Sequence, residues 1–310
     1  MKVQILGAGA VGGCFGGQLA LVGHEVTCFA RGANLAALRE RGLEIRTPEG
    51  ILHAPVTATD RPEMLSAADF AILAVKSYSL AELAPVARHC AELGTAVVSL
   101  LNGVETAERL QEAGVPATAI IGGIAKVSAV RVAPGVVERR SPFQSVVVGE
   151  LDGRTSDRVE RIAAAFRDAG LDARSSERIV VELWEKFIFI SAVAAACGLT
   201  RSPIGPVGAD PLGRRLVQRA VEEAVAVGRA RGVPLPGDAA ARAVTAIGSL
   251  PPATKPSFLV DLESGGPTEL DILSGAVSRL AESYGITTPV HDTVTAALGN
   301  RFNISRERTS

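Results

Sequence analysis

The sequence predicts an α/β fold in which a doubly wound, largely parallel sheet is followed by an all-helical domain. Three observations support this prediction. Strand-like and helix-like segments alternate through the first half of the chain, a glycine-rich stretch directly follows the first strand-like segment, and strand signals fade after Ser175. Such alternation is typical of a parallel sheet whose strands are joined by crossover helices. We therefore expect domains of residues 1–175 and 176–310.

Short apolar runs and helical segments define the elements of the first domain. The predicted strands are Lys2–Leu6, Glu25–Ala30, a hairpin of Leu43–Arg46 and Ile51–Val56, Phe70–Val75 and Ala96–Leu101. The predicted helices between them are Ala10–Val22, Asn34–Arg41, Leu80–Cys90 and Glu105–Ala113. The Phe70–Val75 run is continuously apolar, as expected for a strand buried on both faces. Three further β-rich segments indicate that the sheet becomes mixed: Ala119–Val130, Gly135–Arg140 and Ser145–Gly149.

The second domain is predicted from helical segments alone. Ser176 is a candidate N-cap, with Glu177 in the first turn. The expected helices are Glu177–Cys197, Gly213–Arg231, Asp238–Ile247, Thr268–Tyr284 and Pro289–Asn300. The first contains the apolar run Phe187–Leu199, which is shorter than the roughly 18 residues that a membrane-spanning helix needs. We therefore interpret this run as a buried helix and expect no association with a membrane.

The composition excludes several classes of function. The 310 residues carry 32 Lys plus Arg against 33 Asp plus Glu, so the formal charge is −1. A general nucleic-acid-binding protein normally shows a basic excess, and an aromatic content of 4% offers little surface for stacking bases. No signal-peptide pattern is visible, and the four scattered cysteines have no metal-type spacing. We expect a cytoplasmic protein with reduced cysteines and no metal site.

The glycine-rich stretch is a candidate nucleotide site. Residues Gly7-Ala8-Gly9-Ala10-Val11-Gly12 match G-x-G-x-x-G, directly after a predicted strand and at the start of a predicted helix. In this context the first glycine permits the tight turn, the second lets the backbone approach a pyrophosphate, and the third lets helix and strand pack closely. The alternative is a glycine-rich turn without a ligand. The motif predicts a Rossmann-type dinucleotide site.

The residue after the second strand indicates which dinucleotide is bound. Sites that prefer NAD usually carry Asp or Glu there, about 20 residues after the glycines. This chain has Arg31 instead, whose planar guanidinium suits a 2′-phosphate. We therefore expect NADPH as the cofactor. The alternative is a surface arginine with no ligand.

Further residues, in the same order along the chain, resemble the ketopantoate reductase (2-dehydropantoate 2-reductase) family. The resemblance covers nearly the whole chain. The residues that carry it, besides the fingerprint and Arg31, are Lys76, Asn102-Gly103, Leu183-Trp184-Glu185-Lys186, Ser257 and Thr268-Glu269-Leu270-Asp271. Two of them, Lys76 and Asn102, follow predicted parallel strands, whose carboxyl ends form the ligand edge of an open α/β sheet.

The resemblance implies a role for each matching position. Gly7, Gly9 and Gly12 would hold the pyrophosphate and Arg31 the 2′-phosphate. Lys76 would face the cofactor, and Asn102 would lie near the nicotinamide and the substrate. Lys186 would be the catalytic lysine, Glu269 its partner carboxylate, and Ser257 a substrate contact. The implied reaction is NADPH-dependent reduction of a small 2-oxo acid, with ketopantoate and pantothenate biosynthesis as the family's context. Independently of the resemblance, the apolar helical domain favours a homodimer.

One departure from the family bears on the substrate. The family usually carries asparagines four and eight residues after the lysine, on the same helix face, where they present hydrogen bonds to the substrate. Here these positions are Ile190 and Ala194. Losing such hydrogen bonds should change substrate choice. Arg201 and Ser202, just past this helix, could replace a lost carboxylate contact. The alternative for Arg201 is a cap at the C-terminal end of the helix.

The chemistry of the reaction explains why a lysine is needed. Hydride transfer from a nicotinamide turns a carbonyl oxygen into an alkoxide that needs a proton, and the Lys186 ammonium can polarise the carbonyl and donate it. Glu269 can orient that ammonium and balance its charge. Two alternatives stay open: a non-catalytic NADP(H)-binding redox sensor, favoured by Ile190 and Ala194, and a related β-hydroxy acid dehydrogenase, which the arginine at position 31 argues against.

Overall fold

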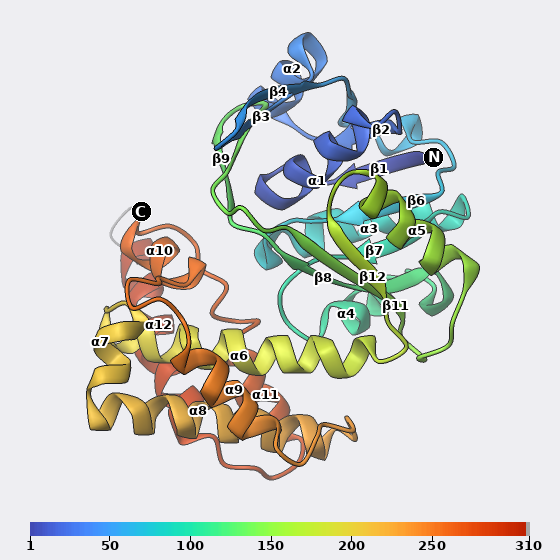
Figure 1. Ribbon diagram of the computed structural model, residues 1–310. Coiled ribbons are helices and arrows are strands. Elements are labelled where there is room, and N and C mark those ends of the chain that lie inside the picture. Colours follow the sequence, from blue (N-terminus) through green and yellow to red (C-terminus); the bar gives the residue numbers. More distant parts are fainter. Residues whose placement is uncertain (308–310) are drawn as a thin grey trace. The chain divides into compact units, whose positions relative to one another are not determined.

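The computed structural model describes the backbone of residues 1–307 and the side chains of residues 1–299 (Figure 1). The described chain divides into two compact units. The first comprises residues 1–101 and 106–180, and the second comprises residues 102–105 and the chain from Val181 onward. A short segment, Asn102–Glu105, thus groups with the second unit although the chain on both sides of it belongs to the first.

The first unit is built on a mixed sheet that, within residues 1–307, has eight strands in the order β12-β11-β8-β7-β6-β1-β2-β5. All neighbours are parallel except β8 and β11, which are antiparallel, so the prediction of a mainly parallel sheet that becomes mixed is confirmed. The strands are β1 (Lys2–Leu6), β2 (Glu25–Phe29), β5 (Thr57–Thr59), β6 (Phe70–Leu73), β7 (Ala96–Ser99), β8 (Ile120–Lys126), β11 (Ser145–Glu150) and β12 (Asp172–Ser175).

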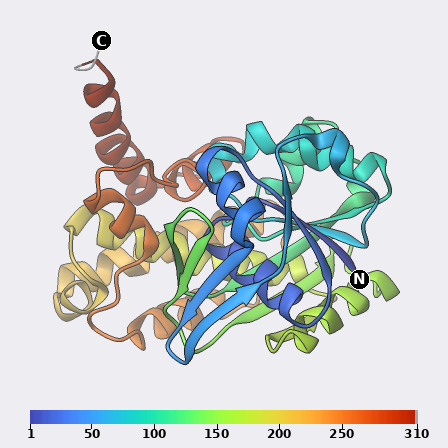
Figure 2. The same ribbon diagram turned by 90° about the horizontal axis from the view of Figure 1, so that it is seen from above.

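Helices cover both faces of this sheet, as the apolar central strands require. Alternate residues of β6 enter different cores: Phe70 and Ile72 pack with Phe15 of α1, whereas Ala71 and Leu73 pack with side chains of α3. Figure 2 shows α3 and α5 on opposite sides of the strands. The helices of this unit are α1 (Ala10–Leu21), α2 (Gly32–Arg41), α3 (Leu80–Glu92), α4 (Thr106–Glu112) and α5 (Asp157–Asp168).

A second, four-stranded sheet within the described residues was not predicted. It has the order β4-β3-β10-β9 and consists of β3 (Leu43–Thr47), β4 (Gly50–Ala54), β9 (Ala129–Ala133) and β10 (Val136–Arg139). The predicted hairpin is confirmed as the antiparallel pair β3–β4. Its parallel partner β10 lies about 90 residues further along the chain, so no local pattern could predict this pairing.

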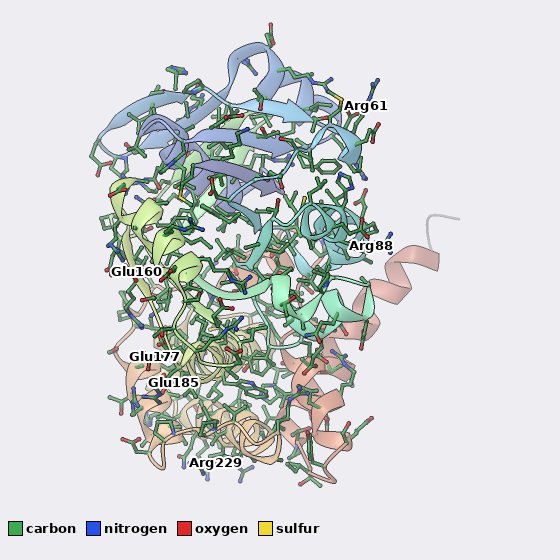
Figure 3. The ribbon with its side chains drawn as sticks, turned by 90° about the vertical axis from the view of Figure 1, so that its right-hand side faces the viewer. Arg61, Arg88, Glu160, Glu177, Glu185 and Arg229 are labelled. Carbon is green, nitrogen blue, oxygen red and sulfur yellow. The ribbon has the colours of Figure 1, made fainter. Side chains whose placement is uncertain are left out.

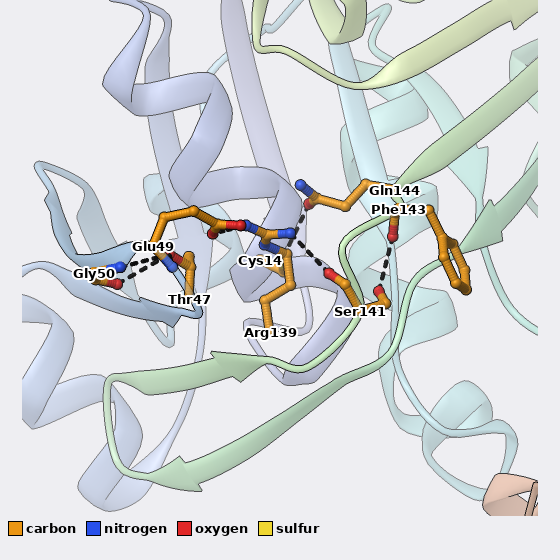
Figure 4. A network of polar contacts seen from close by, with 8 residues as sticks. All are labelled: Cys14, Thr47, Glu49, Gly50, Arg139, Ser141, Phe143 and Gln144. Carbon is orange, nitrogen blue, oxygen red and sulfur yellow. Dashed lines mark hydrogen bonds and ion pairs between the residues drawn. The ribbon is translucent and has the colours of Figure 1, made fainter.

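Buried Arg139 ties this second sheet together (Figure 4). Its side chain is 9% exposed; Nη2 donates to Glu49 Oε2 at 2.5 Å and Nη1 donates to the Ser141 carbonyl at 2.7 Å. Nearby, the Cys14 thiol of α1 donates to Gln144 Oε1 at 3.5 Å. Burial raises the pKa of the Cys14 thiol to about 11, so this cysteine stays a neutral core residue.

The second unit is helical. Helix α6 (Ile179–Thr200) begins in the first unit and continues into the second. The other helices are α7 (Ile204–Ala209), α8 (Pro211–Ala230), α9 (Ala239–Gly248), α10 (Ser257–Glu263), α11 (Ser274–Glu282) and α12 (Pro289–Glu307). Among the described residues, no helix combines the length and apolar character needed to cross a membrane.

The helix predicted to begin at Thr268 begins at Ser274 instead. Leu270, Ile272 and Leu273 are each at most 8% exposed. In a helix, Leu270 and Ile272 would point about 200° apart, so one buried face could not hold both. An irregular segment buries all three and delays the helix by six residues.

A buried polar cluster joins α8, α11 and α12. Glu223 accepts hydrogen bonds from the backbone N–H groups of Val290 (2.9 Å) and His291 (3.0 Å), at the start of α12. The His291 ring, fully buried, lies 3.1 Å from the Ser274 hydroxyl and 3.0 Å from the Ala220 carbonyl. A carbonyl can only accept, so Nε2 carries the proton and Nδ1 accepts from Ser274. Burial lowers the pKa of His291 to about 4.

Candidate active site

The fingerprint glycines lie where β1 ends and α1 begins, at the point where the strand order reverses between β1 and β6. Gly7 has a φ of +105°, and a Cβ there would lie 2.3 Å from Val75 Cγ1. A Cβ on Gly12 would lie 2.2 Å from the Gly7 carbonyl oxygen. Both glycines are therefore required by the fold itself, because any side chain would clash.

Gly9 differs from its two neighbours in the motif. A Cβ built on Gly9 would have no described atom within 4 Å. Packing within the first unit therefore does not require a glycine at position 9. An open space above the backbone at the start of a helix is the geometry that a pyrophosphate requires, because the N–H groups there are directed outward. The residues present thus fit a bound dinucleotide.

Asn34 of α2 holds the fingerprint loop, a role that was not predicted from the sequence. Its amide donates to the Ala8 carbonyl at 3.1 Å, and its Oδ1 accepts from the Gly135 N–H at 2.8 Å. The side chain is 8% exposed. A polar residue near the start of a predicted helix gives no local sign of such a role.

Arg31 lies two residues after the end of β2 and occupies the N-cap position of α2. Its guanidinium lies 5.7 Å from the centroid of the Phe29 ring and forms an ion pair with Glu82, in the first turn of α3. The Arg31 side chain is 52% exposed and the Glu82 side chain is 56% exposed. Arg31 is thus accessible to a ligand, but the Glu82 carboxylate already contacts it, and this contact was not predicted from the sequence.

Lys76 lies on the same edge of the sheet as the fingerprint and Arg31. It follows the end of β6, and β6, β1 and β2 are neighbours in the parallel sheet. The carboxyl ends of these strands therefore bring Gly7, Arg31 and the half-buried Lys76 to one edge. This is the ligand edge of an open α/β sheet.

In the second unit the structure brings Asn102 and Glu269 together. Asn102 Nδ2 donates to Glu269 Oε2 at 3.3 Å, although the two residues are 167 positions apart in sequence. Glu269 is only 5% exposed and belongs to the irregular segment before α11. A buried carboxylate with an amide donor can orient a cationic or hydroxyl group.

Lys186 lies on α6 and is half-buried. The helix is fixed near Lys186 by Trp184, which is 3% exposed and packs edge-on against Phe187 with ring centroids 5.4 Å apart. A Cβ on Gly228 of α8 would lie 2.8 Å from the Trp184 ring, so this glycine permits close packing of the two helices. The tryptophan of the Leu-Trp-Glu-Lys stretch is therefore a packing residue that sets the orientation of α6.

The remaining candidate positions differ in accessibility. Ile190 is half-buried, whereas Ala194 is 2% exposed, so of the two apolar replacements Ile190 is the more accessible. Ser257 is exposed at the first residue of α10. Arg201 directly follows α6 with a φ of +52°, a conformation common just past helix ends, and donates to the Leu262 carbonyl at 3.5 Å. This geometry favours the capping interpretation of Arg201.

Comparison with known proteins identifies the family. The family model "Ketopantoate reductase PanE/ApbA" matches residues 3–153, and its C-terminal counterpart matches residues 178–301. The 2-dehydropantoate 2-reductase of Halobacterium salinarum is 32% identical over 300 residues, covering 94% of this chain and 95% of that protein. The uncharacterized oxidoreductase YkpB of Bacillus subtilis is 29% identical over 303 residues, covering 96% and 98%.

Solved structures agree with this result. A PanE/ApbA family ketopantoate reductase from Ralstonia eutropha superposes with a TM-score of 0.85 at 30% identity, covering 96% of this chain and 97% of that chain. D-mandelate dehydrogenase, solved with NADH and anilino(oxo)acetate, shares the fold, with a TM-score of 0.83 at 23% identity and coverage of 97% and 98%. The resemblance inferred from the sequence is confirmed: the chain belongs to the ketopantoate reductase family of nicotinamide-dependent oxidoreductases, which act on CH–OH groups.

Proposed function

We propose that this protein reduces a 2-oxo acid to the corresponding 2-hydroxy acid with NADPH. The observation that carries the proposal is the hydrogen bond between Asn102 and the buried Glu269, in the same compact unit as Lys186. These three residue types are an amide, a carboxylate and an ammonium. Together they can bind and protonate a reacting carbonyl oxygen.

NADPH, when bound, supplies the hydride. The fingerprint backbone would hold its pyrophosphate above Gly9, where a side chain finds open space. Arg31 would bind the 2′-phosphate, displacing or sharing its contact with Glu82. The cost of breaking that ion pair is small, because both side chains are more than half exposed and a surface pair contributes at most about 1 kcal/mol.

The chain's own residues handle the proton. The Lys186 ammonium would polarise the carbonyl of the substrate and donate a proton to the oxygen as negative charge develops on it. Glu269 would orient that ammonium and balance its charge, with Asn102 holding the carboxylate and contacting the substrate. Ser257, exposed at the start of α10, would supply a further hydrogen bond to the substrate.

The substrate is either 2-dehydropantoate, after which the 2-dehydropantoate 2-reductase relatives are named, or another small 2-oxo acid. Ile190 favours the second possibility, because an accessible apolar side chain four residues after Lys186 cannot hydrogen-bond a substrate hydroxyl. The apolar Ile190 also favours a second candidate function, that of a non-catalytic NADP(H)-binding sensor. We further propose the domains 1–175 and 176–310, a cytoplasmic location and a homodimer.

Steady-state NADPH oxidation with a panel of 2-oxo acids tests this proposal. The panel contains ketopantoate and analogues in which the hydroxyl is replaced by apolar groups. We expect turnover with at least one member, and a preference for the apolar analogues if Ile190 shapes the pocket. NADPH binding without turnover of any member would support the sensor instead.

A further inference from the structure

The segment Asn102–Glu105 is held to the second unit by contacts to the region around Glu269. It leaves the first unit after Leu101 and returns at Thr106. Gly103, with a φ of +94°, packs so closely that a Cβ there would lie 3.3 Å from the Ile272 carbonyl oxygen. A glycine-containing segment of four residues has little order of its own, so its position depends on its partners.

Arg279 of α11 connects the two segments that carry Asn102 and Glu269. Its Nε and Nη2 donate to the two carboxylate oxygens of Glu105 at 3.2 and 2.6 Å. Its Nη1 donates to Asp271 Oδ1 at 3.0 Å, and Nη2 also reaches the Asp271 carbonyl at 3.4 Å. One guanidinium thus joins a residue three positions after Asn102 to a residue two positions after Glu269.

The relative strength of these bonds indicates which of them determines the geometry. The Asn102–Glu269 bond is a single amide donor at 3.3 Å. The Glu105–Arg279 contact has two hydrogen bonds between groups of opposite full charge, whereas the Asn102 amide is neutral and makes one bond to its carboxylate. The Glu105 side chain is 12% exposed and the Arg279 side chain is 42% exposed. The ion pair, rather than the amide bond, therefore fixes where the segment lies.

We propose that Arg279 is a positioning residue that keeps the Asn102 amide within reach of the Glu269 carboxylate. A lysine could not replace it, because a single ammonium lacks the planar fork that binds Glu105 and Asp271 together. Where it concerns turnover, this inference rests on the proposed function. The contacts themselves lie within one compact unit and can be tested without a substrate.

A double-mutant cycle between Arg279 and Asn102 tests the inference. Arg279 bonds to Glu105 and Asp271, and Asn102 bonds to Glu269, so any coupling between the two side chains must pass through the segments that carry these residues. The variants are Arg279→Ala, Asn102→Ala and the double variant, with urea denaturation and kcat/KM as separate readouts. We expect each single variant to lose about tenfold or more in kcat/KM, mainly through kcat, with the Kd for NADPH unchanged. The double variant should be no worse than Asn102→Ala within about twofold.

Arg229→Ala is the matched control. Arg229, labelled in Figure 3, also lies in the helical unit. Its Nη2 donates to the carbonyls of Pro236 and Gly237, both at 3.0 Å. Its loss should cost stability but combine additively with Asn102→Ala and leave kcat/KM within about twofold of wild type. Should Arg279→Ala fail to fold, Glu105→Gln removes the same ion pair from the other side with little change of volume.

Additive losses in the Arg279–Asn102 cycle, in stability and in kcat/KM, would overturn the positioning role. Absence of any 2-oxo acid turnover in the wild type would instead overturn the proposed function. In that case urea denaturation alone decides the inference. Non-additive changes in the free energy of unfolding support it, and additive changes refute it.

Discussion

Gly9→Ala separates the glycine that serves the cofactor from those that serve the fold. An alanine Cβ at Gly9 meets no described atom within 4 Å, so the ligand-free protein should lose no more than about 0.5 kcal/mol of stability. A Cβ at Gly12 would lie 2.2 Å from the Gly7 carbonyl oxygen and 3.0 Å from Ile5 Cγ2. Overpacking of this kind costs about 1–3 kcal/mol or more, so Gly12→Ala should be clearly destabilised.

The two variants should behave differently toward NADPH. At Gly9 the added methyl group occupies the space where a pyrophosphate would approach the backbone, and lost hydrogen bonds to a charged group cost about 1.5–3 kcal/mol. The Kd for NADPH should therefore rise by roughly 10- to 100-fold. Urea denaturation without cofactor and fluorescence titration with NADPH provide the two measurements.

Gly248→Ala is a suitable control, because a Cβ there is equally unobstructed but Gly248 ends α9 in the other unit. It should leave both stability and NADPH affinity near their wild-type values. If Gly9→Ala binds NADPH as tightly as wild type, the pyrophosphate does not lie above Gly9. If Gly9→Ala is as unstable as Gly12→Ala, the space above Gly9 is not open.

Three further predictions concern the nucleotide, the substrate and pH. Arg31→Ala should weaken NADPH binding far more than NADH binding, because only NADPH carries the 2′-phosphate. Glu82→Gln should strengthen NADPH binding, because it removes the carboxylate that competes for Arg31. Equal effects on both nucleotides in titrations would exclude binding of the 2′-phosphate by Arg31. Ile190→Asn should shift kcat/KM toward ketopantoate and away from apolar 2-oxo acids. Because the pKa of His291 falls from 6.5 in the unfolded chain to about 4 when folded, the unfolded state alone gains this proton between those values. Stability should therefore fall by up to about 3 kcal/mol as pH drops from 6.5 to 4, and His291→Gln should flatten this part of the urea-denaturation profile.

Local patterns predicted much of the fold. The strands β1, β2, β6 and β7 and the helices α1 and α3 are each marked by a short apolar run or a helical period, and a neighbouring turn residue marks their ends. The fingerprint was recognisable for the same reason, since its strand, glycines and helix are contiguous. The family resemblance likewise rested on short stretches such as the one around Trp184.

Contacts between distant segments could not be predicted. The second sheet depends on pairing β3 with β10. The short strand β12 was missed because only one of its four residues, Ala173, is buried. Helix α5 was also missed, although its buried apolar residues follow a helical period after the N-cap Ser156. The late start of α11 arises because three nearby apolar residues are buried together, a tertiary effect that overrides helical periodicity. Arg279 and Glu105 are 174 positions apart. Glu82 meets Arg31 although α3 follows β6, which is separated from β2 in the sheet by β1.

Turnover by Lys186→Ala tests the central claim most directly. Wild-type protein and variant are mixed with NADPH and the best 2-oxo acid of the panel, and NADPH oxidation is followed together with the Kd for NADPH. Loss of the proton donor should reduce turnover by about 100-fold or more, while NADPH binds with nearly wild-type affinity. A variant that retained wild-type turnover would contradict the assignment of Lys186 as the general acid.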